Sequence, residues 1–435
     1  MSVPVTMAPA GGRGCARTAP DAADRPPASA GRGDREAGAG TRRLRVLVFA
    51  WHAPWPLTHG GHLRLYHWLR MLSAAADVTL VTGRPAEAGL ALPPGTRHVV
   101  AAGGAAREGS VPATAHWFAR RLRANWGYDP ELHATLAALT KRGSFDVVLC
   151  SGTVAGLYVE AFRAPVVWDL VDDLVLHVAR DMGGAPWGRP WGAWTAGARR
   201  ALRYAWYERY VAGRARHTVV ASARDASWLR RWTRGPVAVV SNGVDGEYFR
   251  PAPGRAEATT VAFVGALDFA PNIDAAVWFA RCVWPALYAA GVARRFTVVG
   301  RAPAGEVRAL QSLPGVEVHG DVPDVRPYLH AAAVVVVPTR KGAGVKNKVL
   351  EACAAGRPVV ASPQALAGLT ARIGRDVLAA ARAEAWIATV GALLRNPQRA
   401  DELAAAGRRW VETAHTWEGM GARLRAVLDR AARHG

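Results

Sequence analysis

Glycine, lysine and glutamate residues with the chemistry of an anion site gather in segment 338–360. Residues 331–337, just before it, form an apolar run rich in valine, which is typical of a parallel strand buried on both faces. Gly342 and Gly344 end this run, and apolar residues then recur at helical spacing until Gly356. A glycine turn that leads into a helix presents free backbone N–H groups and the positive end of the helix dipole to an anion. The segment therefore predicts an anion-binding turn between a strand and a helix.

Charged side chains flank this turn. Lys346 and Lys348 add positive charge at the start of the helix, and Glu351 follows Lys348 by one helical turn. A carboxylate at this point suits a pair of sugar hydroxyls, so the combination predicts a site for a nucleoside diphosphate sugar. The alternative explanation is a surface ion pair between Lys348 and Glu351, which stand at i and i+3.

A second strand-to-helix turn lies near the N-terminus. Residues 44–50 predict a buried first strand, and a helix is expected to begin near His62. Gly60 and Gly61 would occupy the turn and Arg64 the first helical turn, so the same anion-binding argument applies. The spacing lacks the GxGxxG pattern of dinucleotide-binding folds, which disfavours a dehydrogenase.

Three carboxylates follow the strand-like run at 165–168. Asp169, Asp172 and Asp173 are expected at the carboxyl end of that strand, where α/β proteins bind ligands. This position favours a catalytic role for Asp169 and Asp172. One alternative is that Asp172 or Asp173 caps the following helix. Another alternative is that the clustered carboxylates bind a magnesium ion.

The composition narrows the class of protein. The chain has 435 residues, a formal net charge of +21 and 50% hydrophobic residues. Its arginines are scattered rather than gathered in one basic tract, which disfavours nucleic acid as a partner. A basic surface would help the protein to sit on an anionic membrane face, although no run of about 18 apolar residues predicts a membrane span. Its four cysteines are widely spaced, so they indicate neither zinc nor disulfides and fit a reducing cytoplasm.

Tryptophan and arginine are unusually frequent in segment 187–232. Such amphipathic content is typical of a helix that lies on a membrane surface. A helix that packs its aromatic side chains into the domain while its arginines face water is the favoured interpretation.

Segment 342–360, with the pattern GxGxKxKxLEAxAxGxPVV, resembles the donor-binding motif of family 4 glycosyltransferases of the GT-B fold, in the branch that includes exopolysaccharide sugar transferases. The phrase NGVD at 242–245, followed by a phenylalanine and a proline, resembles the close of the N-terminal domain in this family. The resemblance implies an α/β protein with two Rossmann-like, doubly wound parallel-sheet domains that face each other across a cleft.

The family's phosphate-binding residues are only partly present. Many members carry an arginine and a lysine after the glycine that corresponds to Gly265, whereas this chain has no basic residue there and has Asn272 in the region of the lysine. The resemblance therefore implies that Lys346 and Lys348 supply the missing charge. Arg301, after a strand-like run, is a further candidate for a base or phosphate contact, or else an arginine in solvent.

The acidic signature is also incomplete. Ala343 stands eight positions before Glu351, where the family usually has its first acid, so only the second, ribose-binding glutamate is carried over. A histidine found in many members is replaced near Val171, which leaves the general base unassigned. The predicted catalytic residues are Asp172, Asp169 and Lys348. The predicted donor-binding residues are Gly60, Gly61, Arg64, Gly265, Asn272, Arg301, Gly342, Gly344, Lys346, Lys348 and Glu351.

The resemblance implies a retaining enzyme that moves a sugar from a nucleoside diphosphate sugar to a glycan or lipid-linked acceptor, without a metal or another cofactor. The alternative is a catalytically inactive nucleotide-sugar-binding protein of the same fold. We expect a cytoplasmic protein, with association at the inner face of the membrane left open. The expected organisation is a disordered tail at 1–41, an acceptor domain at 42–249, a linker at 250–259, a donor domain at 260–416 and a C-terminal helix at 417–435 that crosses back to the first domain.

Overall fold

The computed structural model describes most of the chain after the expected tail. The described residues are 42–55, 57, 60–84, 91–101, 128–142, 145–182, 191–252, 256–342 and 344–433. The tail predicted at 1–41, and Ala343 in the glycine turn, lie outside the described residues.

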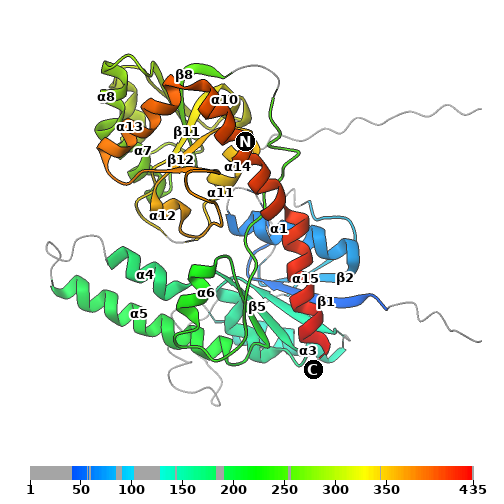
Figure 1. Ribbon diagram of the computed structural model, residues 1–435. Coiled ribbons are helices and arrows are strands. Elements are labelled where there is room, and N and C mark those ends of the chain that lie inside the picture. The colour runs from blue at the N-terminus through cyan, green and yellow to red at the C-terminus, as the bar shows by residue number, and fades with distance from the viewer. Residues whose placement is uncertain are drawn as a thin grey trace, which may run out of the picture. The chain divides into compact units, whose positions relative to one another are not determined.

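The first sheet has seven parallel strands in the order β3-β2-β1-β4-β5-β6-β7 (Figure 1). The chain runs outward from β1 to β3 and then returns to β4 beside β1, so the strand order reverses between β1 and β4. In open α/β sheets, ligands bind outside the carboxyl ends of the strands at such a reversal. The strands are β1 (Leu44–Ala50), β2 (Ala76–Thr82), β3 (Thr96–Val100), β4 (Val147–Ser151), β5 (Val166–Val171), β6 (His217–Val220) and β7 (Val237–Val239).

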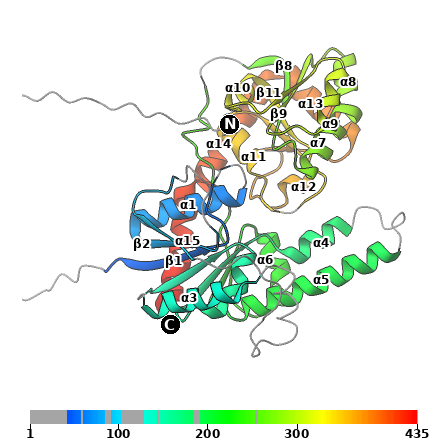
Figure 2. The same ribbon diagram turned by 180° about the vertical axis from the view of Figure 1, so that it is seen from behind.

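Helices cover both faces of this sheet because its central strands are apolar on both sides. Val46 and Val48 of β1 belong to a core with α1 and α15, whereas Leu47 and Phe49 pack in a second core on the other face. Helices α1 and α15 lie side by side in both views (Figure 1, Figure 2). The elements are α1 (Gly60–Ala75), α3 (Pro130–Arg142), the 3₁₀ helix η1 (Val154–Ala161), α4 (Leu174–Met182), α5 (Trp191–Ala212), α6 (Ala223–Leu229) and α15 (Trp417–Arg433).

The second sheet has six parallel strands in the order β10-β9-β8-β11-β12-β13. Its strand order reverses between β8 and β11, so the turns that follow these two strands meet at a predicted ligand position. The strands are β8 (Glu257–Val264), β9 (Arg295–Gly300), β10 (Val316–Gly320), β11 (Ala332–Val337), β12 (Val359–Ala361) and β13 (Leu378–Ala379). Its helices are α7 (Ala270–Cys282), α8 (Trp284–Ala289), α9 (Gly305–Arg308), η2 (Ala309–Ser312), α10 (Arg326–Ala331), α11 (Asn347–Ala354), α12 (Pro363–Leu366), α13 (Ala383–Arg395) and α14 (Pro397–Ala414).

The chain passes between the two sheets twice, and the two passages are bonded to each other. The backbone N–H of Val244 donates to the carbonyl of His415 at 2.8 Å, and Val244 forms a parallel bridge with Thr416. A Cβ atom on Gly243 would lie 2.6 Å from the backbone nitrogen of Trp417, so only glycine fits at this crossing. Helix α15 then contacts α1, β4 and β5.

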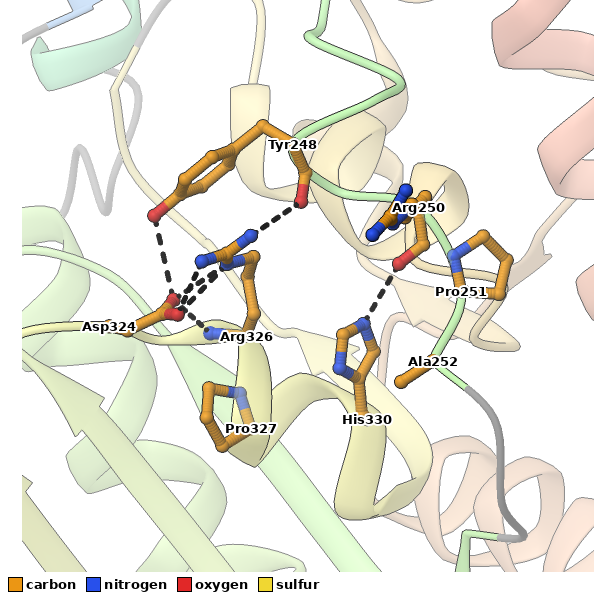
Figure 3. Close-up of a pocket in the computed structure, with 8 residues that line it drawn as sticks. All are labelled: Tyr248, Arg250, Pro251, Ala252, Asp324, Arg326, Pro327 and His330. Carbon is orange, nitrogen blue, oxygen red and sulfur yellow. Dashed lines mark hydrogen bonds and ion pairs between the residues drawn. The ribbon is translucent and has the colours of Figure 1, made fainter. Parts of the chain in front are cut away.

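Beyond this crossing, the chain is attached to α10 (Figure 3). The guanidinium of Arg326 lies 4.0 Å from the ring centroid of Tyr248 and donates to the Tyr248 carbonyl at 3.2 Å. His330 makes a hydrogen bond of 3.1 Å with the carbonyl of Arg250. Together with Asp324, these residues line a cavity of about 250 Å³. The segment around 248–252 is therefore attached to α10 before β8 begins.

None of the described helices combines the length and the apolar character that a membrane crossing requires.

Candidate functional site

The turn between β11 and α11 has the backbone that its glycines predict. Gly342 and Gly344 have φ angles of 90° and 79°, which is a left-handed region that glycine occupies without strain. Helix α11 begins at Asn347, and Lys346 before it gives no side-chain cap. The first N–H groups of α11 and its dipole are therefore directed at the space beside the turn.

Side chains of α7 and α12 make hydrogen bonds and ion pairs with the turn between β11 and α11. Gln364 donates to the carbonyl of Gly342 at 2.8 Å. Asp274 of α7 accepts two hydrogen bonds from Arg340, at 2.8 and 3.1 Å, and pairs with Lys341 at 3.2 Å. These contacts tie the turn to α7 and α12, which favours a backbone that is preorganised for an anion.

Lys348 joins this turn to the end of β8. Its Nζ donates to Oδ1 of Asn272 at 2.5 Å and lies 4.7 Å from the ring centroid of Phe263. The Asn272 Nδ2 donates to the carbonyl of Ala266 at 2.8 Å, which orients the amide. A Cβ atom on Gly265 would lie 2.9 Å from the Lys348 Nζ, so the glycine makes room for the ammonium group. The structure thus brings Gly265, Asn272 and Lys348 together.

Lys346, Lys348 and Glu351 form the charged part of the site. A Cβ atom on Gly342 would lie 3.5 Å from the Lys346 Nζ, so this ammonium group lies over the turn. Burial, together with the charge of Lys346, lowers the pKa of Lys348 to about 7, although Glu351 acts in the opposite direction. Burial raises the pKa of Glu351 to about 7, against the opposing charge of Lys348. An anion that bound here would favour the protonated form of Lys348.

Asp172 reaches the same turn from the end of β5. A Cβ atom on Gly344 would lie 2.5 Å from each of its carboxylate oxygens, so Asp172 lies directly against the turn. Val171 before it has a φ of 73°, a strained value for a β-branched residue, which is typical of functional positions. Its neighbour Asp173 is buried and accepts from the N–H of Leu176 at 2.6 Å, as a helix cap does.

Clustered carboxylates such as Asp172 and Asp173 raise the question of a metal site. Among the residues that the structure describes, no group of three or more His, Cys, Asp or Glu side chains is placed to hold a metal ion.

Arg64 near the start of α1 and Asp169 near the end of β5 pair with each other. Both are fully buried, and they pair at 2.8 Å. Trp68 and the Nε of Arg64 both donate to Oδ2 of Asp169, each at 3.0 Å. Arg64 also donates to Asn242 and to the carbonyl of Val240, both at 2.8 Å. A substrate could reach either side chain only by breaking a buried, hydrogen-bonded ion pair, which is costly. We therefore reassign Arg64 and Asp169 from substrate contact and catalysis to positioning of β7 and the crossing segment.

The N-terminal glycines differ slightly from their predicted form. Gly60 and Gly61 are the first residues of α1 rather than a turn before it, so their own N–H groups belong to the open end of the helix. A Cβ atom on Gly60 would lie 3.5 Å from Nδ2 of Asn347, whereas one on Gly61 would meet no atom within 4 Å. The start of α1 therefore lies beside the start of α11.

Two asparagines in this region were not anticipated from the sequence. Asn242 donates from Nδ2 to Oδ1 of Asn347 at 2.9 Å and, through Oδ1, accepts from Arg64. Through these bonds, Asn242 links the buried Arg64–Asp169 pair to Asn347, which is the first residue of α11. The phrase NGVD drew attention to Asn242 only as a turn, because nothing in its residue type indicates a partner 105 positions away.

Arg301 lies next to the turn that follows β8. Its backbone carbonyl accepts from the N–H of Leu267 at 2.8 Å, and its guanidinium pairs with Asp268 at 3.3 Å. Gly300 is required before it, because a Cβ atom there would lie 1.7 Å from the carbonyl oxygen of Gly265. Arg301 is thus close to Gly265 but is directed at an acidic neighbour.

The second domain and the fold both resemble known proteins. Residues 258–396 match a family model described as glycosyl transferases group 1. A search of curated proteins by sequence found no significant match.

Solved structures with a similar fold cover almost the whole chain. Sucrose-phosphate synthase from Thermosynechococcus elongatus has a TM-score of 0.67 at 17% identity, over 90% of this chain and 100% of that one. Anabaena Alr3699/HepE in complex with UDP has a TM-score of 0.62 at 14% identity, over 89% and 100%. WaaG, a glycosyltransferase involved in lipopolysaccharide biosynthesis, has a TM-score of 0.59 at 13% identity, over 88% and 99%. At these identities the likeness shows the fold. The two parallel-sheet α/β domains match the GT-B arrangement, which confirms the predicted fold class.

Proposed function

We propose that this chain, whose second domain matches the glycosyl transferases group 1 model, transfers a sugar from a nucleoside diphosphate sugar to an acceptor hydroxyl. The observation that carries the proposal is the turn between β11 and α11, where Lys346, Lys348 and Glu351 meet at the reversal of the second sheet. Its support includes neighbours of the same fold that were solved with UDP-glucose, as Anabaena Alr3699/HepE was, or with UDP, as TarM was.

Within this proposal, the turn binds the diphosphate. The first N–H groups of α11 and the ammonium groups of Lys346 and Lys348 would contact its oxygens, where charge grows as the glycosidic bond to phosphate breaks. Because free Lys348 has a pKa of about 7, a bound diphosphate would draw a proton onto it and hold it as a full cation. Catalysis would then rest mainly on positioning and on stabilisation of the leaving diphosphate.

Glu351 and Asp172 would act at the two ends of the donor. No hydrogen bond or ion pair engages the Glu351 carboxylate within the described part of the chain, so it is available to accept from ribose hydroxyls. Asp172 lies against Gly344 and would contact the transferred sugar. Lys348, which donates to Asn272 and lies against Gly265, is the residue to which we assign stabilisation of the leaving group.

We further propose the retaining course of family 4 enzymes, in a hexosyltransferase of polysaccharide biosynthesis. In that course the bond from the anomeric carbon to the phosphate oxygen breaks, and the acceptor oxygen bonds to the same face. The acceptor proton passes to the departing phosphate oxygen, so the products are the glycoside and the nucleoside diphosphate. No cofactor is needed, and a glycan or a lipid-linked saccharide on the cytoplasmic side of a membrane is the proposed acceptor.

A nucleotide-sugar binder without activity is the second candidate. It is favoured by Ala343, which stands where the family usually has its first acid. Incubation of the purified protein with radiolabelled UDP-sugars and GDP-sugars separates the two. Transfer or slow hydrolysis of one donor supports the enzyme, binding without turnover supports the second candidate, and failure to bind any donor contradicts both.

A further inference from the structure

Helix α5 displays large apolar side chains on the face that points away from the core. Trp194, Leu202 and Trp206 are 49%, 64% and 54% exposed. At about 100° per residue they fall within one sector of about 120°. The opposite side of the helix carries Tyr207 and Val211, which are buried in the core of the first sheet. The helix is therefore packed on one face, whereas these three side chains are largely exposed on the other.

The same exposed side is strongly cationic. Arg199, Arg203 and Arg209 are exposed on it. The single acid of α5, Glu208, is fully buried, where its oxygens accept from the N–H of Leu174 at 2.7 Å and from Trp232 at 2.9 Å. No exposed carboxylate therefore offsets the arginines among the described side chains of α5.

Helix α6 continues this surface. Its acid, Asp225, is also buried, whereas Arg230 and Arg231 at its end are exposed. Arg209 of α5 donates to the carbonyl of Trp232 at 3.0 Å, which joins the two helices. The Arg231 guanidinium lies 4.4 Å from the ring centroid of Trp228. Aromatic and basic groups thus extend from α5 onto the end of α6.

We propose that this surface docks the protein on an anionic membrane. On α5 this surface consists of Trp194, Arg199, Leu202, Arg203, Trp206 and Arg209. Tryptophan and leucine side chains gain by leaving water for the boundary between head groups and acyl chains. Arginines beside them attract anionic head groups.

Other occupants fit this surface less well. A second copy of the chain related by a twofold axis would oppose arginines with arginines. A nucleic acid would use the arginines but leave Leu202 in water. Docking does not depend on the proposed reaction. If the proposed function holds, docking also brings the donor site close to a lipid-linked acceptor.

Vesicle sedimentation with the full chain tests the proposal. The protein should bind phosphatidylcholine vesicles that contain about one third phosphatidylglycerol, bind pure phosphatidylcholine vesicles far less, and lose affinity as salt rises. Arg199→Glu/Arg203→Glu should weaken binding by about thirtyfold or more, since each basic residue near the surface contributes about fivefold. Trp194→Ala/Leu202→Ala should weaken it by about tenfold.

The control variant is Arg409→Glu/Arg423→Glu, which makes the same change in net charge at two exposed arginines of α14 and α15. It should bind vesicles almost as the parent does, and circular dichroism should show all variants folded. Equal losses in both arginine pairs, or a Trp194→Ala/Leu202→Ala variant that binds like the parent, would overturn the proposal. Binding to a DNA duplex that depends on Arg199 and Arg203 but not on Leu202, without vesicle binding, would assign the surface to nucleic acid instead.

A depth measurement gives an independent readout. Cys15 and the exposed Cys282 are first replaced by serine, and an environment-sensitive dye is attached at Leu202→Cys or, as a matched control, at Ile373→Cys, which replaces an exposed apolar residue of the second domain. Anionic vesicles should shift the emission at position 202 to shorter wavelength and leave position 373 unchanged. No shift at 202 despite sedimentation would show that another part of the chain holds the membrane, and would overturn the proposal.

Discussion

Replacement of Lys348 by methionine should weaken nucleoside diphosphate binding while it leaves nucleoside binding almost unchanged. The substitution keeps the unbranched stem beside Phe263 but removes the ammonium group that contacts Asn272. A charge-assisted hydrogen bond contributes roughly 1.5–3 kcal/mol, which corresponds to about tenfold to a hundredfold in affinity. A nucleoside has no phosphate to lose, so its affinity should change little.

The pKa of Lys348 gives this prediction a pH dependence of definite sign. Below its pKa of about 7, the free protein already carries the proton that the diphosphate requires. Above it, binding must take up a proton, so affinity should fall by up to about tenfold per pH unit. Lys348→Met has no ammonium group and cannot take up that proton. Protonation of the ligand affects both proteins equally, so it cancels in the ratio of parent to variant affinity.

Titration calorimetry from about pH 6 to pH 9, in buffers with different ionisation enthalpies, measures both the affinity and the protons taken up. The matched control is Lys141→Met, which removes an exposed lysine of α3 and should change neither. A ratio of parent to Lys348→Met affinity that stays near one at every pH would refute the assignment of Lys348 to the diphosphate.

Three further substitutions test other parts of the site. Glu351→Gln should weaken nucleoside and nucleoside diphosphate by similar factors in the same calorimetry, because it removes a charged acceptor for ribose hydroxyls and leaves the phosphates alone. Gly344→Ala should cost about tenfold in diphosphate affinity, since a side chain at a φ of 79° is strained and would meet the Asp172 carboxylate; unchanged affinity would refute that placement. Asp169→Ala should lower the free energy of unfolding in urea by about 3–5 kcal/mol because it leaves Arg64 buried without its partner, and a loss of less than about 1 kcal/mol would contradict the reassignment of this pair.

The sequence predicted those features of the fold that are local. The first strand was expected at residues 44–50 and is observed there, because alternate residues of an apolar run pack into cores on both faces. The glycine turn after β11 was predicted because Gly342 and Gly344 are needed where φ is positive. Helix starts were less accurate: a helix was expected to begin near His62, whereas α1 already includes Gly60.

Contacts between distant residues were not predictable from one sequence. Arg64 was expected to meet a phosphate because of its position after a glycine turn, yet its partner Asp169 lies 105 residues away on another strand. The clamp of Asp274 on Arg340 was missed for the same reason. The sequence also did not show which side chains of the tryptophan-rich segment are buried. That depends on how the helix is oriented against the sheet, which buries Tyr207 and exposes Trp206.

The central claim is that the turn between β11 and α11 holds the donor diphosphate, and a structure of the protein crystallised with UDP or GDP tests it most directly. The account predicts that the diphosphate oxygens contact the ammonium groups of Lys346 and Lys348 and the first N–H groups of α11, with the ribose hydroxyls on Glu351. A diphosphate bound away from this turn, with Lys348 still bonded to Asn272 and Glu351 without a ligand contact, would contradict it.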